Sequence, residues 1–366
     1  MPKKTALYDK HINAGARMVD FGGWELPVQF EGILAEHRHC RSAAALFDCS
    51  HMGQFHIKGP DAAAALSRVC TQDAEALKTG RAKYGYLLNE KGGILDDAIL
   101  MRLAKDHFHL VVNAGTQDED YAWIRRKLTG DLKITNLSLN HSWAKIDLQG
   151  PESLTILAPL VQDDLALWKF FSVGETQMDG RKVVLSRTGY TGELGYEIMG
   201  RADDIIAIFD KIMSDERVQP AGLGARDSLR LEMNYPLYGH ELNITTTPLE
   251  ADGEMFLDLD RDFIGSEALR RQKAKGTDRF LIAYSAETRR RTSPGDEIWI
   301  DQRKVGEVTS GVFSPSLETS IGMGYVETTL ATPGTSLTVR TKRADIEITV
   351  QDKPLYKKGT CRKKVS

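Results

Sequence analysis

Four short segments of the sequence carry residue types that could do chemistry. The first is Gly92-Gly93-Ile94-Leu95-Asp96-Asp97, where a glycine turn leads into two acids ahead of an apolar run. Asp is a poor strand former, so two acids at the start of a predicted strand are unusual. One interpretation is that they cap backbone N–H groups of a turn. In the functional interpretation, strand alternation points one carboxylate into a cleft and the other away from it.

The second segment is a glycine-rich stretch, Ser186-Arg187-Thr188-Gly189-Tyr190-Thr191-Gly192-Glu193-Leu194-Gly195-Tyr196-Glu197. Its three glycines permit close approach of the backbone to a ligand. Its two tyrosines and two carboxylates suit a flat, polar heteroaromatic ligand, because rings stack and acids accept N–H groups. The alternative is an ordinary glycine-rich hairpin loop.

The third segment, 222–232, contains Arg226 and Asp227 near a predicted helix start. These two side chains could pair with each other, or they could face the carboxylate and amine of a ligand. The alternative is a helix start with exposed charges.

The fourth segment, 48–53, holds Asp48, Ser50 and His51. Neighbouring strand residues point to opposite faces, so this local sequence predicts no catalytic triad. The spacing of the other histidines predicts alternating surface positions and no metal site; they are His37, His39, His107 and His109.

Several standard motifs are missing from the sequence. It contains neither a G-x-x-x-x-G-K-[ST] loop nor a G-x-G-x-x-G turn after a strand, so nucleotide phosphate binding is unsupported. It contains no H-E-x-x-H and no G-x-S-x-G elbow, so a zinc protease and a serine hydrolase are unsupported as well.

The elements that must position these segments follow an α+β pattern. Strands are predicted at 54–58, 84–88, 98–103, 107–112, 143–148, 182–186 and 196–199, and helices at 62–70, 117–128 and 202–213. The phrase Lys58-Gly59-Pro60-Asp61 resembles Gln149-Gly150-Pro151-Glu152, and each stands between a strand and a helix. This similarity suggests two related α+β halves.

The last quarter of the chain has a different rhythm. From Arg279 onward, short alternating runs break at glycines, which predicts a small antiparallel β domain. Residues 273–277 are the predicted linker to it, and 357–364 form a basic tail.

Composition narrows the class of protein. The 366 residues carry a formal net charge of -3, and they lack the basic excess that phosphate binding needs, so no nucleic-acid partner is expected. No apolar run approaches the roughly 20 residues that span a bilayer, so no membrane association is expected. The four cysteines show no C-x-x-C spacing, which predicts free thiols. No apolar signal core follows Met1, so we expect a cytoplasmic protein.

Taken in order, these segments resemble the T-protein (aminomethyltransferase) family of the glycine cleavage system. The resemblance is nearly full length and is carried by 15–21, 23–24, 47–48, 50–53, 92–97, 187–193, 222–232, 236–241, 248–251, 262–265, 306–311 and 313–315. Several places depart from the family pattern, among them the segment 113–116, Glu119 where a lysine is usual, and Lys357 where an arginine is usual. Met101 stands where an aromatic residue is common, and Asp252-Gly253-Glu254-Met255-Phe256 replaces the usual Gly-Leu-Gly-Trp phrase.

The resemblance implies an α+β fold of three domains in a cloverleaf around a central folate channel. The first two domains would be interleaved α+β domains, 1–52 with 137–226 and 53–136 with 227–276. The third, 277–366, would be an antiparallel β-barrel or jelly-roll-like domain.

The resemblance also implies a reaction and its partners. The lipoyl arm of the H-protein would deliver an aminomethyl group, and its carbon would pass to tetrahydrofolate, the co-substrate, with release of ammonia and no metal. Positioning and charge control suit this chemistry better than a covalent nucleophile does. The H-protein is generally acidic, so a basic surface near the channel would favour its docking.

Site residues follow from the same resemblance. Asp97 would be the catalytic acid facing the folate and the reactive carbon, while Asp96 points elsewhere. Glu197 would accept pterin N–H groups, and Arg226 would contact the folate or the arm. The remaining expected site residues are Tyr84 and Tyr190 flanking the folate rings, Met52 and Asn113 lining the site, Asp227 supporting Arg226, and Lys357 meeting the glutamate tail of the folate.

Two alternatives remain open. One is another tetrahydrofolate-dependent enzyme of the same fold, such as a demethylase that takes a methyl group from a small sulfonium, amine or aryl ether. The other is a non-catalytic folate-binding or assembly protein.

Overall fold

The chain packs into two compact units. The computed structural model describes residues 2–139 and 142–364. The first unit comprises Met1–Gly85, Ala98–Asp227 and Gly359–Ser366, and the second comprises Tyr86–Asp97 and Ser228–Lys358. Each unit therefore combines segments that are distant in the sequence.

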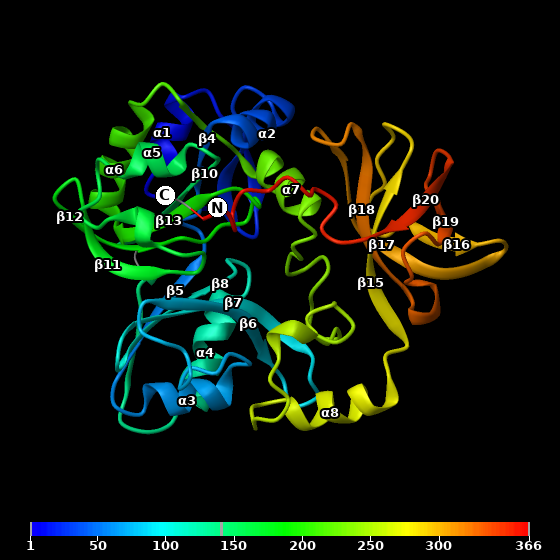
Figure 1. Ribbon diagram of the computed structural model, residues 1–366, viewed down its shortest axis with the longest axis horizontal. Coiled ribbons are helices and arrows are strands. Elements are labelled where there is room, and N and C mark those ends of the chain that lie inside the picture. The colour runs from blue at the N-terminus through cyan, green and yellow to red at the C-terminus, as the bar shows by residue number, and fades with distance from the viewer. Residues whose placement is uncertain (1, 140–141, 365–366) are drawn as a thin grey trace. The chain divides into compact units, whose positions relative to one another are not determined.

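A six-stranded sheet forms the centre of the first unit (Figure 1). Its strands, in spatial order, are β11 (Val173–Met178), β12 (Arg181–Ser186), β13 (Gly195–Arg201), β10 (Trp143–Gln149), β4 (Ala44–Asp48) and β14 (Val218–Pro220). Neighbours pair antiparallel except β4 and β14, which are parallel. The helices α1 (Tyr8–Asn13), α2 (Ile33–Ser42), α5 (Ser153–Leu157) and α6 (Ala202–Met213) accompany this sheet, with a 3₁₀ turn at η2 (Leu165–Leu167).

A second sheet of five strands includes the acid-bearing segment. Its order is β6 (Arg81–Leu88), β7 (Ile94–Ala104), β8 (His107–Val112), β5 (Gly53–Lys58) and β9 (Lys133–Asn136). The helices α3 (Ala62–Val69) and α4 (Gln117–Lys127) belong to the same stretch of chain. A small third sheet has the order β1 (Lys3–Lys4), β3 (Trp24–Gln29) and β2 (Arg17–Phe21).

Apolar side chains of the two larger sheets pack against each other within the first unit. Met101 and Val111 come from the five-stranded sheet, and Val184 and Met199 from the six-stranded sheet, and all four are buried in one cluster. Burial of this kind stabilises by about 25 cal/mol per Å² of apolar surface. The cluster fixes how the two sheets lie in this unit.

The two glycine-proline phrases form matching elbows between a strand and a helix. Gly59 joins β5 to α3 with φ +143°, and Gly150 joins β10 to α5 with φ +141°. A Cβ would lie 2.3 Å from the carbonyl oxygen of Asp131 at the first elbow and 2.1 Å from that of Ala43 at the second. Glycine is required twice for the same reason, which supports the suggestion of two related halves.

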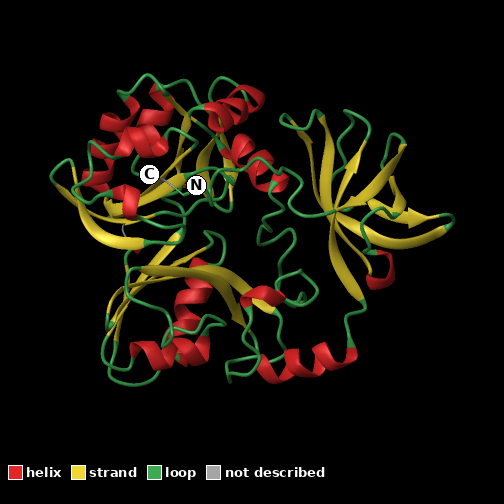
Figure 2. Cartoon of the chain, viewed as in Figure 1, coloured by secondary structure: helices red, strands yellow, loops and turns green. Residues whose placement is uncertain are grey.

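The second unit contains a closed antiparallel barrel. Its strands, in order, are β15 (Arg279–Ala286), β18 (Thr319–Glu327), β17 (Arg303–Ser314), β16 (Glu297–Ile300), β19 (Ser336–Arg340) and β20 (Asp345–Gln351). Alternate apolar side chains fill its interior, among them Ile298, Val339 and Ile348. Figure 2 shows that the barrel consists almost wholly of strands, whereas the rest of the chain contains both helices and strands. The predicted C-terminal β domain and the α+β fold class are confirmed.

Three elements precede the barrel in the chain: α7 (Leu223–Glu232), η3 (Glu254–Phe256) and α8 (Ser266–Lys275). A fourth, η4 (Thr328–Leu330), stands between the barrel strands β18 and β19. The predicted linker at 273–277 is wrong in part, because α8 continues to Lys275. The predicted division into three domains stays a prediction.

The prediction of surface positions for the histidines is wrong for three of the four. His37, His107 and His109 are buried, and only His39 is partly exposed. His107 and His109 share one face of β8, and the ring of His56 on β5 lies 4.5 Å and 4.9 Å from theirs. Alternation places residues on one face of a strand, but it does not say whether that face meets water.

Candidate functional site

The candidate site in the first unit begins with two charged residues on β10. Lys145 and Asp147 are two positions apart, so they lie on the same face of the strand. Both side chains are only 1% exposed, and they form an ion pair. Asp147 is directly opposite Glu197 of β13, and Lys145 Nζ lies 2.8 Å from Glu197 Oε2. The central strands thus carry one buried lysine between two carboxylates.

A second cation comes from helix α7. The Arg226 Nη1 donates a hydrogen bond of 3.1 Å to Asp147 Oδ2, and its guanidinium lies 5.0 Å from the centre of the Tyr190 ring. The thiol of Cys49 donates to the same Asp147 oxygen over 3.2 Å. Two cations thus face two carboxylates, and the balance of charge compensates for their burial.

The pKa values show how this cluster is ionised. Burial alone would raise the pKa of Asp147, but Lys145 and Arg226 outweigh it and lower that pKa below its ordinary value. Burial alone would lower the pKa of Lys145, but Asp147 and Glu197 raise it above its ordinary value. Both groups therefore stay charged at neutral pH. The cluster is a fixed set of buried charges, and neither Lys145 nor Asp147 readily donates or accepts a proton.

Cys49 is not a nucleophile in this setting. Its burial, the largest effect, raises the pKa of the thiol far above the ordinary value. Because the thiolate is the reactive form, this thiol is inert. All four cysteines are free thiols, as the sequence predicts.

The segment 48–53 forms no triad, which confirms the prediction. Asp48 Oδ2 accepts from Thr5 Oγ1 over 2.6 Å and lies 2.9 Å from His11 Nε2. Ser50 Oγ donates to the backbone oxygen of Lys145. His51 is buried, and burial lowers its pKa to about 4, so the ring is neutral.

The structure brings three predicted site residues together around the buried cluster: Tyr190, Glu197 and Arg226. Tyr190 stands in the glycine-rich loop 187–194, and the ion-pair partner of Arg226 is Asp147. The other predicted residues of the first unit are half-buried; they are Met52 after β4, Tyr84 in β6, Asn113 after β8 and Asp227 in α7.

Asp97 belongs to the second unit, at the start of β7. Burial alternates along this strand: Asp96 is fully buried, whereas Asp97 is half-buried on the other face. The two neighbouring carboxylates therefore point in opposite directions, as strand alternation requires. Lys357, also in this unit, is exposed after β20, and its Nζ lies 3.3 Å from the backbone oxygen of Asp352.

Sequence reasoning missed Lys145, Asp147 and Cys49. A signal was present, because the apolar strand Trp143-Ala144-Lys145-Ile146-Asp147-Leu148 carries two opposite charges at a spacing of two. Charged residues on an inner face are rare unless they are paired. Among the residues that the structure describes, no group of three or more His, Cys, Asp or Glu side chains is arranged to hold a metal ion. Within the same residues, no helix is long and apolar enough to cross a membrane.

Comparisons with known proteins place the chain in a family. The model of the GCVT N-terminal domain matches residues 7–261, and that of the glycine cleavage T-protein C-terminal barrel domain matches residues 281–357. The chain belongs to the glycine cleavage T-protein family.

Individual relatives agree over the full length. An aminomethyltransferase of Bacillus cytotoxicus is 38% identical, with 98% of this chain and 99% of the relative covered. One of a Geobacillus species is 39% identical over 98% of this chain and all of the relative. The crystal structure of glycine cleavage system aminomethyltransferase T from Bartonella henselae matches with a TM-score of 0.92 at 34% identity, covering 98% of this chain and 99% of that one.

Proposed function

We propose that this protein is the aminomethyltransferase of a glycine cleavage system. It transfers the methylene carbon of aminomethyl-dihydrolipoyl H-protein to tetrahydrofolate. The carbon exchanges its bonds to the arm sulfur and the amino nitrogen for bonds to two folate nitrogens, and the two displaced folate protons pass to the sulfur and the amine. The products are methylene-tetrahydrofolate, dihydrolipoyl H-protein and ammonia, and the reaction runs in the cytoplasm.

The observation that carries this proposal is the buried cluster of Lys145, Asp147, Glu197 and Arg226 beside Tyr190. Lys145 holds one oxygen of Glu197, and the carboxylate offers its other oxygen to the N–H groups of the pterin. Arg226 and Tyr190 add a planar cation and a ring on which a flat heterocycle can stack. Full-length similarity to aminomethyltransferases supports this choice over a demethylase.

The catalytic role belongs, in this proposal, to Asp97. Its carboxylate orients the folate amines and stabilises the positive charge that develops on the transferred carbon. Tyr84 joins Tyr190 at the folate rings. Met52 and Asn113 line the site, Asp227 supports Arg226, and Lys357 meets the glutamate tail as a point charge.

The proposal is tested by the donor that the enzyme requires. Ammonia release should depend on aminomethylated, lipoylated H-protein, and H-protein without lipoate should give none. Folate-dependent consumption of a small methyl donor, with no ammonia from H-protein, would instead support the demethylase alternative.

A further inference from the structure

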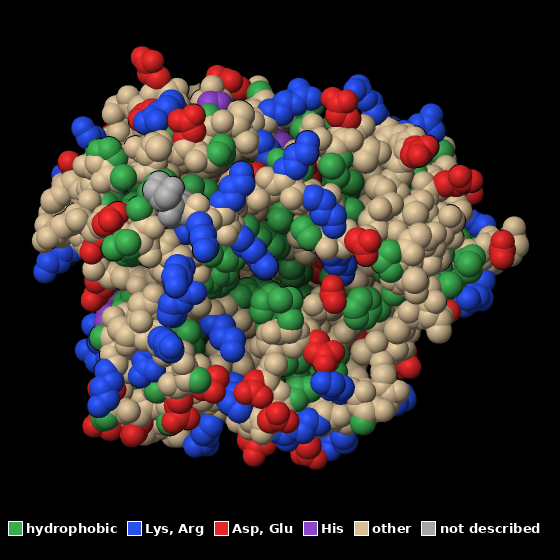
Figure 3. Space-filling model, in the orientation of Figure 1, with side chains coloured by type: hydrophobic (Ala, Val, Ile, Leu, Met, Phe, Trp, Pro, Cys, Tyr) green, Lys and Arg blue, Asp and Glu red, His purple; other side chains and the backbone are tan. Residues whose placement is uncertain are grey.

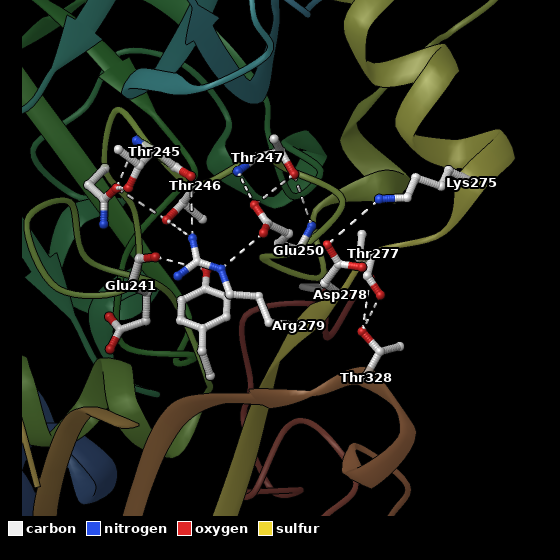
Figure 4. Close-up of polar contacts among 12 residues, drawn as sticks. Glu241, Thr245, Thr246, Thr247, Glu250, Lys275, Thr277, Asp278, Arg279 and Thr328 are labelled. Carbon is white, nitrogen blue, oxygen red and sulfur yellow. Dashed lines mark hydrogen bonds and ion pairs between the residues drawn. The ribbon is translucent and has the colours of Figure 1, made fainter. Parts of the chain in front are cut away.

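Arg279, the first residue of barrel strand β15, connects the barrel to a threonine-rich loop in the second unit (Figure 4). Its Nε donates to Glu250 Oε1 over 2.9 Å. Its Nη2 lies 3.3 Å from both the backbone oxygen of Thr245 and Thr246 Oγ1. The guanidinium also lies 4.7 Å from the centre of the Tyr325 ring. One side chain thus contacts three residues of loop 243–250 and one barrel strand.

Loop 243–250 is organised by its own side chains as well. Glu250 Oε2 accepts from the backbone N and the hydroxyl of Thr247, so both carboxylate oxygens are engaged. Asn243 Oδ1 accepts from the backbone N of Thr245 over 2.9 Å and from Thr246 Oγ1 over 3.2 Å. The backbone N of Leu281 donates to the backbone oxygen of Glu250, and this bond joins the end of the loop to β15.

The same loop also contacts the start of the acid-bearing strand. The Ile94 backbone N donates to the backbone oxygen of Thr246 over 2.9 Å. Asn89 Nδ2 donates to the Ile244 oxygen over 3.3 Å. A Cβ on Gly93 would lie 2.0 Å from that same oxygen, so the loop and the glycine turn touch backbone to backbone. The direction of β7 at its first residue therefore depends on where Thr246 lies.

We propose that Arg279 is a positioning residue for Asp97, acting through loop 243–250. Asp97 stands three residues after Ile94 in the same strand, and fully buried Thr246 links Arg279 to Ile94 by a hydroxyl contact on one side and a carbonyl contact on the other. If the loop relaxes when Arg279 is lost, the first residues of β7 can shift, and the carboxylate of Asp97 shifts with them. This inference rests on the proposed function, since Asp97 is the group that it positions.

The planar fork of arginine suits this place better than a lysine. Arg279 contacts a carboxylate, a carbonyl and a hydroxyl while it lies over a ring, and an ammonium cannot reproduce that set. With its side chain 40% exposed, the ion pair to Glu250 by itself contributes little to stability. The role of Arg279 is therefore to hold loop 243–250 in position.

The test compares Arg279→Gln with Arg340→Gln. Arg340 is a matched control, because it also lies over an aromatic ring of the barrel, 3.7 Å from the centre of Trp299, with 35% of its side chain exposed. We expect Arg279→Gln to speed hydrogen exchange at the Ile94 amide. We also expect kcat to fall about tenfold, as slight misplacement of a catalytic group would cause, while the dissociation constant for tetrahydrofolate stays the same. Arg279→Lys should give intermediate values of the exchange rate and of kcat, and Arg340→Gln should leave both at the wild-type values.

Two results would overturn the inference. One is unchanged exchange at Ile94 in Arg279→Gln, and the other is faster exchange with an unchanged kcat. A wild-type protein that forms no methylene-tetrahydrofolate would contradict the proposed function. In that case the exchange comparison would still decide the structural link between Arg279 and Ile94.

Discussion

The carboxylate of Glu197 pairs with Lys145 in the protein, and its proposed second partner is the pterin ring of the folate. Loss of a charged hydrogen bond to a ligand costs on the order of 2 kcal/mol. At the residue scale, the consequences of changing this carboxylate are therefore the most direct test of the pterin contact.

We expect Glu197→Gln to raise the dissociation constant for tetrahydrofolate at least about tenfold, measured by calorimetry. Glu193→Gln is the matched control. Glu193 is also a buried carboxylate, 2% exposed, and it pairs with Arg41 at 2.8 Å. That variant should lower the melting temperature and leave folate affinity unchanged. Equal folate affinity in Glu197→Gln and the wild type would reject the pterin contact.

Asp97 is the second test at this scale. The variant Asp97→Asn keeps the shape of the side chain and removes its charge, so folate binding should remain while kcat falls by a factor of about 10² to 10⁴. Asp96→Asn is the control at the neighbouring, fully buried position, and it should lower the melting temperature and leave kcat unchanged. Rapid-quench measurement of methylene-tetrahydrofolate separates turnover from binding. Full turnover by Asp97→Asn would remove Asp97 from the mechanism.

The buried cluster shows what could be predicted residue by residue. Tyr190, Glu197 and Arg226 stand in recognisable phrases of the sequence, so they could be proposed as site residues before the structure showed that they lie around one cluster. Lys145 and Asp147 stand in a strand whose pattern reads as apolar, and two of their ion pairs, with Glu197 and Arg226, form only between elements that are distant in the sequence. Pairing between residues 50 or more positions apart, as between Lys145 and Glu197, leaves no local pattern.

At the scale of elements, the two glycine-proline elbows are strict requirements of the backbone. Gly150→Ala should lower the free energy of unfolding by more than about 2 kcal/mol, because a positive φ is combined with a clash against the Ala43 oxygen. Gly180→Ala is the control, with φ +75° and nothing within 4 Å of its Cβ, and should cost about 1 kcal/mol. Urea unfolding measures both, and equal losses would refute the elbow argument.

The histidines between the two large sheets predict sensitivity to acid. Burial is the main cause that lowers the pKa of His56 to about 3 and that of His109 well below 6.5. The unfolded chain takes up these protons as the pH falls below 6.5, and the folded chain does not. The free energy of unfolding is therefore unaffected above pH 7 and falls below pH 6.5, by up to about 1.4 kcal/mol per pH unit for His109.

The slope of stability against pH between 6.5 and 5 measures this effect. His109→Gln cannot titrate and should flatten that slope, whereas His39→Gln, half-exposed in α2, is the control for the substitution itself. An unchanged slope in His109→Gln would show that this histidine does not resist protonation. The sequence could not predict the effect, because it does not show which face of β8 is covered.

Most individual elements followed from periodicity, whereas their pairing did not. The strand at 107–112 and the helix at 202–213 match β8 and α6 closely. Strand β7 begins at Ile94, earlier than predicted, and the N–H of Ile94 bonds there to the carbonyl of Thr246, a contact with a distant residue that no local pattern shows. The linker at 273–277 was misplaced because Gln272, Lys273 and Lys275 are as suitable for a helix as for a linker.

At the scale of the whole molecule, surface charge should govern the encounter with the H-protein. Figure 3 shows Lys and Arg side chains gathered over the first unit. Arg362, Lys363 and Lys364 of the C-terminal tail are exposed. An acidic carrier protein would be attracted to such a surface, and salt would screen the attraction.

We expect the association rate with H-protein to fall at least about tenfold between 50 mM and 500 mM salt, with a smaller change in the dissociation rate. Surface plasmon resonance with immobilised H-protein measures both rates. Folate affinity at the same salt concentrations corrects for general effects. An association rate that is independent of salt would exclude electrostatic steering.

The most direct test of the central claim is the formation of ammonia and methylene-tetrahydrofolate from aminomethylated H-protein, with and without tetrahydrofolate. We predict that the two products form in equal amounts and that tetrahydrofolate strongly accelerates both. Ammonia release at the same rate without folate, or the absence of methylene-tetrahydrofolate when folate is bound, would contradict the proposed carbon transfer.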